Sequence, residues 1–184
     1  MTSVCVFCGS RAGHDPQYTE AARQIAEEIV QTGMTTVYGG GSVGIMGTVA
    51  DVCLAADAPI IGVIPQALAD VELMHPGVTQ MRVVADMHAR KALMHQLSDG
   101  YLALPGGFGT MEELFEVLCW SQLNLHQSPI AIFNQNGLFD PLIQLAERMV
   151  QEGFLDDKSR SLMSVLNSVT DVRRWLGDLA AGSD

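Results

Sequence analysis

Residues 101–123 read YLALPGGFGTMEELFEVLCWSQL, and the order of residue types in this segment indicates the fold class. It begins with the short apolar run YLAL, which is typical of a buried strand. A turn that contains Gly106, Gly107 and Gly109 follows, and residues from about 111 to 123 have the length and composition of a helix. A strand that passes through a glycine-rich turn into a helix is the building unit of a parallel sheet covered by helices.

The same alternation of strands and helices runs along the chain without an internal repeat or boundary. Asp15, Pro16 and Gly33 delimit a helix at 16–32, and Asp86 begins another at 87–97. We expect further helices at 45–56, 140–152 and the C-terminal end, and strands at 3–7, 35–38, 59–64, 79–84, 129–133 and near 162–165, with 66–77 irregular. The sequence therefore predicts one α/β domain over residues 1–184, a doubly wound, mostly parallel sheet with helices on both faces.

A second glycine-rich turn, YGGGSVGIMG at 38–47, also joins an expected strand to an expected helix. In open α/β sheets, ligands bind at the carboxyl ends of strands, where glycines admit them and helix starts attract anions. Gly39, Gly41 and Gly44 also match the dinucleotide fingerprint, but the next strand ends without the acid that would hold the ribose of NAD. We therefore expect a phosphorylated ligand other than NAD, the alternative being glycines that only shape tight turns.

The overall charge excludes several kinds of partner. The chain has 10 Lys and Arg against 21 Asp and Glu, a net charge of −11, so it has no general attraction for nucleic acid polymers or anionic membranes. No apolar run approaches the roughly 20 residues of a membrane helix, and the N-terminus lacks the basic region of a signal peptide. Cys5 and Cys8 fall on an expected strand, where their spacing sends them to opposite faces. We expect reduced thiols and a cytoplasmic location.

Two adjacent cations stand out in this acidic chain. Arg90 and Lys91 lie early in the helix expected at 87–97, where a positive charge opposes the helix dipole. This placement favours a functional role, with a solvated helix face as the alternative. His88 and His95 are two turns apart and match no metal-binding pattern, so we expect no metal site.

Thr110 and Glu113 have the spacing of a capping box, in which Thr110 is the N-cap of the following helix. On that interpretation Glu113 has a structural role only. The three glycines that precede Thr110 are not needed by a cap, and they favour a ligand site. The spacing by itself leaves both interpretations open.

As a set, these motifs resemble the LONELY GUY family of cytokinin riboside 5′-monophosphate phosphoribohydrolases, which are often mislabelled lysine decarboxylases. The segment PGGFGTMEE at 105–113 matches the family signature P-G-G-x-G-T-x-x-E. MHARK at 87–91 resembles the second family motif, and the segments 38–47 and 4–10 resemble its glycine-rich and N-terminal segments. The resemblance extends to about Gly153.

The resemblance implies a modified Rossmann fold, a homodimer and hydrolysis of the N-glycosidic bond of a nucleoside 5′-monophosphate, including AMP, to the free base and ribose 5-phosphate. It implies that Arg90 and Glu113 are the catalytic pair and that no metal or cofactor takes part. Cys119 stands where plant members often have Thr. The expected substrate-binding residues are Glu72, Lys91, Gly107, Phe108, Gly109, Thr110, Met111 and Glu112, together with Gly41 and Ser42.

The chemistry of the bond agrees with this pair. Breaking an N-glycosidic bond builds positive charge on the ribose ring, and a carboxylate such as Glu113 can stabilise that charge or orient the attacking water. Arg90 can bind the phosphate or ribose, or keep Glu113 ionised. Gly41, Ser42 and the N–H groups of Gly109 and Thr110 can take phosphate oxygens.

The helix after Glu113 is apolar on nearly every side. Its large side chains cannot all face one core, so we expect a two-fold partner to cover the remainder, with a helix central in one core as the alternative. These side chains are Leu114, Phe115, Val117, Leu118, Trp120 and Leu123.

Two further function classes stay open. One is a nucleotide-binding protein that senses AMP or a related ligand without turnover. The other is a pyridoxal-phosphate decarboxylase, for which Lys91 is the plausible Schiff-base lysine.

Overall fold

The computed structural model describes residues 2–69 and 74–182. Within these ranges, seven strands form one sheet in the order β4-β3-β2-β1-β5-β6-β7, and every neighbouring pair is parallel. The strands are β1 (Ser3–Phe7), β2 (Thr35–Tyr38), β3 (Ile60–Pro65), β4 (Gln80–Val84), β5 (Gly100–Ala103), β6 (Ile130–Phe133) and β7 (Met163–Leu166).

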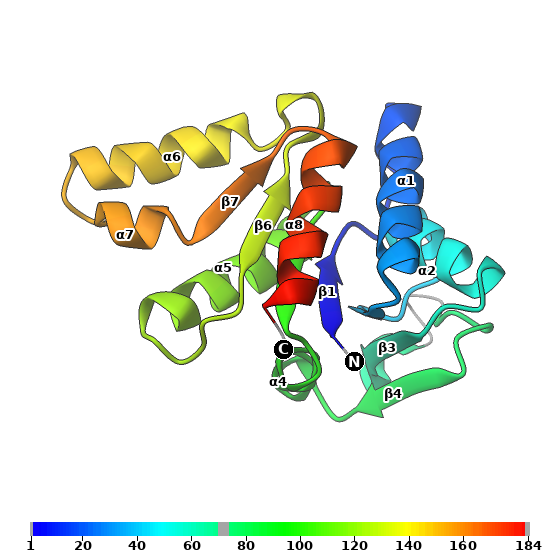
Figure 1. The fold of residues 1–184 in the computed structure, drawn as a ribbon. Coiled ribbons are helices and arrows are strands. Elements are labelled where there is room, and N and C mark those ends of the chain that lie inside the picture. The colour runs from blue at the N-terminus through cyan, green and yellow to red at the C-terminus, as the bar shows by residue number, and fades with distance from the viewer. Residues whose placement is uncertain (1, 70–73, 183–184) are drawn as a thin grey trace.

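The helices lie between successive strands of the chain, except α8, which follows β7 (Figure 1). They are α1 (Pro16–Thr32), α2 (Gly44–Ala55), α3 (Gln66–Ala69), α4 (Met87–Gln96), α5 (Phe108–Gln122), α6 (Asp140–Gln151), α7 (Asp157–Arg160) and α8 (Val169–Ala181), with a short 3-10 helix at Gln135–Gly137. The short elements α3, α7 and Gln135–Gly137 were not predicted, and α3 begins the segment expected to be irregular.

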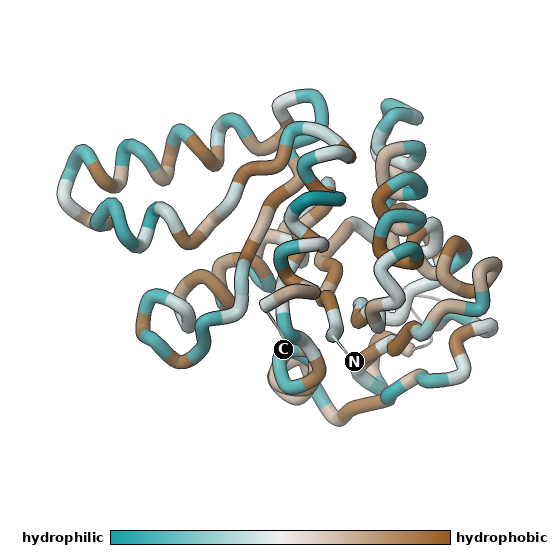
Figure 2. The backbone as a smooth tube through the Cα atoms, in the orientation of Figure 1, coloured by the Kyte–Doolittle hydropathy of each residue, from teal (hydrophilic) through white to brown (hydrophobic). Residues whose placement is uncertain are grey.

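Two apolar cores lie on opposite faces of the sheet, as the doubly wound prediction requires. Alternate residues of β1 divide between them: Val4 and Val6 pack with α1, α2 and α8, whereas Cys5 and Phe7 pack with α4 and α5. Figure 2 shows the hydrophobic character of the central strands and the alternating character of the outer helices. The fold prediction is confirmed.

Local capping signals fix several boundaries. The Asp15 side chain accepts a hydrogen bond from the Gln17 N–H, and Gly33 ends α1 in the left-handed conformation at φ 70°. Asp86 caps α4 through the Ala89 N–H at 2.8 Å. These three predicted caps are confirmed.

The sheet order places a switch point beside β1. From β1 the chain builds β2, β3 and β4 on one side, and it then returns to form β5 on the other side. The loops that leave β1 and β5 therefore diverge and leave a crevice between them, which is where ligands bind in such sheets. A hydrogen bond from the Gly9 N–H to the Pro105 carbonyl, 3.1 Å long, joins the two loops at this point.

Among the described residues, no helix combines the length and the apolar character needed to cross a membrane.

Candidate active site

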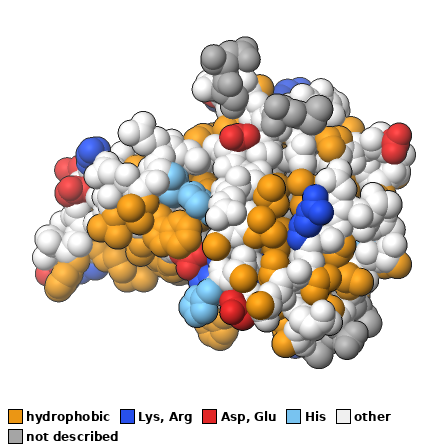
Figure 3. Space-filling view, turned by 90° about the horizontal axis from the view of Figure 1, so that it is seen from below, with side chains coloured by type: hydrophobic (Ala, Val, Ile, Leu, Met, Phe, Trp, Pro, Cys, Tyr) orange, Lys and Arg blue, Asp and Glu red, His pale blue; other side chains and the backbone are white. Residues whose placement is uncertain are grey.

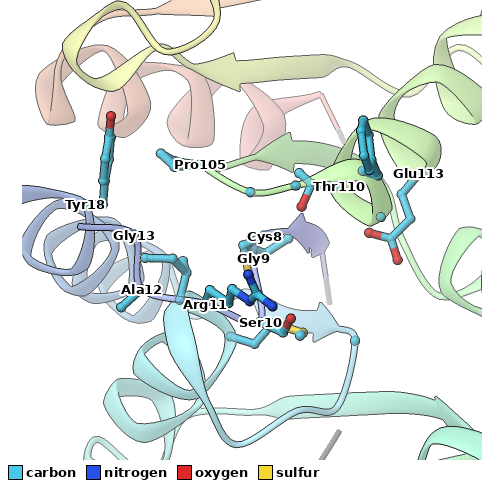
Figure 4. A pocket seen from close by; sticks show the side chains of 18 of the residues that line it. Cys8, Gly9, Ser10, Arg11, Ala12, Gly13, Tyr18, Pro105, Thr110 and Glu113 are labelled. Carbon is cyan, nitrogen blue, oxygen red and sulfur yellow. The ribbon is translucent and has the colours of Figure 1, made fainter. Parts of the chain in front are cut away.

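A cavity of about 510 Å³ opens at the switch point (Figure 4). Its walls are the loop after β1, Gly39 at the end of β2, Arg90 of α4, the loop after β5 and the first two turns of α5. Figure 4 shows Thr110 and Glu113 on one side of this space and the loop from Cys8 to Gly13 on the other. The cavity has the size of a small-molecule site.

Two glycines allow the walls to meet this closely. A Cβ atom on Gly106 would lie 2.0 Å from Thr110 Oγ1 and 2.9 Å from the Gly9 nitrogen. A Cβ atom on Gly39 would lie 2.2 Å from Arg90 Nη2. Gly106 thus lets the two switch-point loops pack against each other, and Gly39 lets the Arg90 guanidinium rest on the end of β2.

Arg90 is a buried cation with a fixed orientation. Its Nε donates to the Val63 carbonyl and its Nη2 to the Gly39 carbonyl, both at 3.1 Å. The remaining Nη1 lies 3.8 Å from Oε1 of Glu113. Carbonyl dipoles from β3 and the end of β2, together with one carboxylate, therefore offset the cost of burying this charge near a helix N-terminus.

Glu113 is not part of a capping box, so that interpretation is wrong. Helix α5 begins at Phe108 with Gly107 as its N-cap, three residues before the predicted start. Thr110 is therefore inside the first turn, where it is buried against Gly106. Glu113 follows in the second turn, only 8% exposed, and faces Arg90.

The first turn of α5 presents backbone donors to the cavity. Gly107 is the N-cap and has no side chain, so it forms no side-chain hydrogen bond with the first-turn N–H groups. Residues 107–110 all line the cavity, so the predicted ligands Gly107, Phe108, Gly109 and Thr110 are brought together there. Helix starts of this kind suit anions.

Lys91, the neighbour of Arg90 on α4, does not line the cavity. Its ammonium group contacts Glu112 and lies 2.6 Å from Oε2 of Glu116, both on α5. Burial lowers the pKa of Lys91, but the hydrogen bonds to the two glutamates outweigh it and leave the pKa above its ordinary value. Lys91 thus joins α4 to α5.

Several predicted substrate ligands lie away from the cavity lining. Lys91, Glu112 and Met111 belong to this group, as do Gly41 and Ser42. Gly41 instead forms a bridge with Met74. Glu72 lies outside the described residues. Substrate contact by these residues stays a prediction.

The structure adds residues that the sequence analysis did not select. Ser10, Arg11 and Tyr18 line the cavity from the loop after β1 and from α1. Cys8 lines it as well, and burial raises the pKa of its thiol far above the ordinary value. The available signal was the position of the sequence CGSR directly after the first strand, beside the switch point.

The expected state of the cysteines agrees with the structure. Cys5 and Cys8 lie in different cores, on opposite faces of the sheet, and Cys53 is also buried. Cys119 is exposed on α5. Among the described residues, no group of three or more His, Cys, Asp or Glu side chains could hold a metal ion.

Comparison with solved structures supports the fold. The molybdenum cofactor carrier protein of Chlamydomonas reinhardtii matches with a TM-score of 0.73 at 18% identity, covering 98% of each chain. The molybdenum cofactor binding protein of Rippkaea orientalis matches with a TM-score of 0.71 at 20% identity, covering 97% of this chain and 96% of that one. The fold and the position of the cavity define a Rossmann-like α/β protein with its site at the switch point of the sheet.

Sequence comparison identifies the family. A family model described as a possible lysine decarboxylase matches residues 46–176. A probable cytokinin riboside 5′-monophosphate phosphoribohydrolase of Oryza sativa subsp. japonica is 45% identical over 160 residues, which cover 87% of this chain and 72% of that protein. An enzyme of Arabidopsis thaliana with the same activity in its name is 42% identical over 173 residues, which cover 94% of this chain and 80% of that protein. The chain belongs to the LONELY GUY family of phosphoribohydrolases, as its motifs indicated.

Proposed function

We propose that this chain hydrolyses the N-glycosidic bond of cytokinin riboside 5′-monophosphates and of AMP, releasing the free base and ribose 5-phosphate. The observation that carries the proposal is the Glu113 carboxylate facing the buried guanidinium of Arg90 in the switch-point cavity. Family membership supplies the reaction class, because the relatives are named for this activity.

Glu113 acts on the ribose. The transition state has oxocarbenium character, and a negative charge held beside the ring stabilises it. The same carboxylate orients the water that attacks the anomeric carbon. Arg90 is restrained by two backbone carbonyls, so it holds the carboxylate in one place instead of moving with it.

The start of α5 binds the phosphate. Residues 107–110 line the cavity, and the first-turn N–H groups offer hydrogen bonds and the positive end of the helix dipole. These phosphate contacts lie at a distance from the bond that breaks. Their binding energy positions the substrate so that its anomeric carbon lies beside Glu113.

The surroundings of Lys91 argue against a decarboxylase that uses a pyridoxal-phosphate Schiff base. A lysine that forms a Schiff base must become a neutral amine, and enzymes achieve this by lowering its pKa. The two glutamates raise the pKa of Lys91 instead, and the residue lies outside the cavity lining.

We further propose that the protein works as a homodimer in the cytoplasm. Phe115 is 40% exposed and Leu123 is 68% exposed, so α5 retains apolar surface that this chain leaves uncovered. Figure 3 shows hydrophobic side chains gathered on the side of the molecule where α5 lies. A two-fold partner would cover this surface. The buried thiols suit a reducing compartment.

The test is a product assay. Purified protein is incubated with AMP and an isopentenyl-type cytokinin nucleotide, and with the matching nucleosides and triphosphates, and the free base and ribose 5-phosphate are quantified. We expect both products in equal amounts from the monophosphates. A protein that binds AMP and releases neither product would be a nucleotide sensor, and the proposal would be wrong.

A further inference from the structure

Apart from Arg11, the charged side chains in and beside the cavity pair with charges of opposite sign. Among the described lining residues, those charged at neutral pH are Arg11, Arg90 and Glu113. Arg90 and Glu113 face each other, so their charges largely cancel. Lys91, the other cation predicted to meet the substrate, is neutralised by Glu112 and Glu116 on α5. Arg11 therefore supplies the excess positive charge that a phosphate dianion needs.

The backbone at Arg11 is held from both sides. The Gly9 N–H donates to the Pro105 carbonyl at 3.1 Å, and the Gly9 carbonyl accepts from the Met46 N–H of α2 at 3.2 Å. A Cβ atom on Gly44 would lie 2.4 Å from the Arg11 nitrogen, so the start of α2 packs directly against this residue. The loop therefore projects the Arg11 side chain from a fixed base.

The guanidinium of Arg11 is available to a ligand. Arg11 is exposed, and no carboxylate in the described ranges forms an ion pair with it. Asp15, the nearest acid along the loop, accepts hydrogen bonds from the Gln17 N–H and the Asn136 amide instead. In Figure 4 the Arg11 side chain extends from its loop toward the centre of the cavity, with Thr110 on the opposite side.

We propose that Arg11 binds the 5′-phosphate of the substrate, opposite the start of α5, and sets the preference for nucleotides over nucleosides. This inference rests on the proposed function. A guanidinium binds phosphate through two parallel hydrogen bonds and adds a full positive charge, which the first-turn N–H groups do not carry. The contact is the same in the bound substrate and in the transition state, so it lowers KM and leaves kcat nearly unchanged.

The experiment compares Arg11→Gln with Arg174→Gln, which removes an exposed cation of α8 paired with Asp171. For Arg11→Gln we expect KM for AMP to rise about 10- to 100-fold and the inhibition constant of ribose 5-phosphate to rise in parallel, since one charge-assisted contact is lost. Its kcat for AMP and its kcat/KM for adenosine should stay within about threefold of wild type. Arg11→Lys should recover part of the loss, and Arg174→Gln should match wild type.

The outcomes separate the two proposals. An unchanged KM for AMP and an unchanged inhibition constant in Arg11→Gln would overturn the role of Arg11, as would equal losses on AMP and adenosine. If the wild-type protein releases no base from any nucleotide, the proposed function fails instead. Thermal stabilisation by ribose 5-phosphate then still tests Arg11, because a wild-type shift that persists in Arg11→Gln contradicts the inference.

Discussion

Glu113→Gln isolates the charge of the proposed catalytic carboxylate from its shape. At 3.8 Å and an effective dielectric constant of about 20, the gross attraction between Arg90 and Glu113 is about 4 kcal/mol. Removing one partner of a buried ion pair costs about 3–5 kcal/mol when the other charge is left uncompensated. Arg90 keeps its two carbonyl partners in the variant, so we expect a smaller net loss of about 1–3 kcal/mol in the free energy of unfolding. The variant should fold and still bind AMP.

Turnover should fall much more than stability. The neutral amide no longer opposes the positive charge that develops on the ribose, and we expect kcat to fall at least about 100-fold, which corresponds to about 2.7 kcal/mol. The assay measures base release at saturating AMP, with chemical unfolding and AMP-induced thermal stabilisation measured on the same preparations.

The matched control is Glu116→Gln, which makes the same chemical change one turn further along α5. Glu116 contacts Lys91, which keeps Glu112 as a partner, and it does not line the 510 Å³ cavity. We expect this control to turn over AMP within a few-fold of wild type. Turnover by folded Glu113→Gln at a rate similar to that of the control would refute the catalytic role of Glu113.

Three further predictions concern the scaffold. Gly106→Ala should destabilise the protein and abolish turnover, because its Cβ would lie 2.0 Å from a side-chain oxygen in the first turn of α5, whereas Gly109→Ala meets nothing within 4 Å and should keep or raise stability in chemical unfolding. The hydrogen bonds from Arg173 hold the pKa of Glu28 below its ordinary 4.5, so the pair stabilises the fold above that pH and the contribution is lost as the pH falls through the lowered pKa. The Arg173 side chain is 64% exposed, so solvent screens the pair, and Glu28→Gln should cost only about 1 kcal/mol at pH 7 in urea unfolding. The difference from wild type should shrink on acidification, and a constant difference would contradict the assignment. Sedimentation should show a wild-type dimer at micromolar concentration and a shift to monomer in Leu123→Glu, since a charge would replace a 68% exposed apolar side chain on the proposed interface.

The sequence predicted the fold well because the relevant signals are local. Short runs rich in β-branched and apolar residues marked the seven described strands, and Asp15, Gly33 and Asp86 marked helix ends through contacts within three residues along the chain. The predicted start of α5 was wrong because the spacing of Thr110 and Glu113 also fits a capping box, which is another signal of short range. Tertiary packing determines where this helix begins. Thr110 packs against Gly106 inside the first turn, and the N-terminal end of the helix faces a cavity instead of a capping side chain.

The site was predicted less completely, because the direction in which each side chain points depends on how its helix packs on the sheet. Successive residues of a helix point about 100° apart, so Arg90 and Lys91 leave α4 in different directions. The sequence identified both cations, but only the positions of β2, β3 and α5 determine which one turns inward. Arg90 finds the carbonyls of Gly39 and Val63, and Lys91 is left to α5.

The second cation in the described cavity lining is Arg11, and the order of the strands in the sheet explains its position. In the described sheet the neighbour of β5 on the side of β2 is β1, so the loop after β1 lies beside the loop after β5. The loop after β1 carries Arg11 into the cavity from a position 79 residues before Arg90, a separation that no local pattern reveals. The adjacency of Arg90 and Lys91 in sequence therefore does not place both of them in the cavity lining, whereas the adjacency of β1 and β5 in the sheet brings Arg11 and the start of α5 to one cavity.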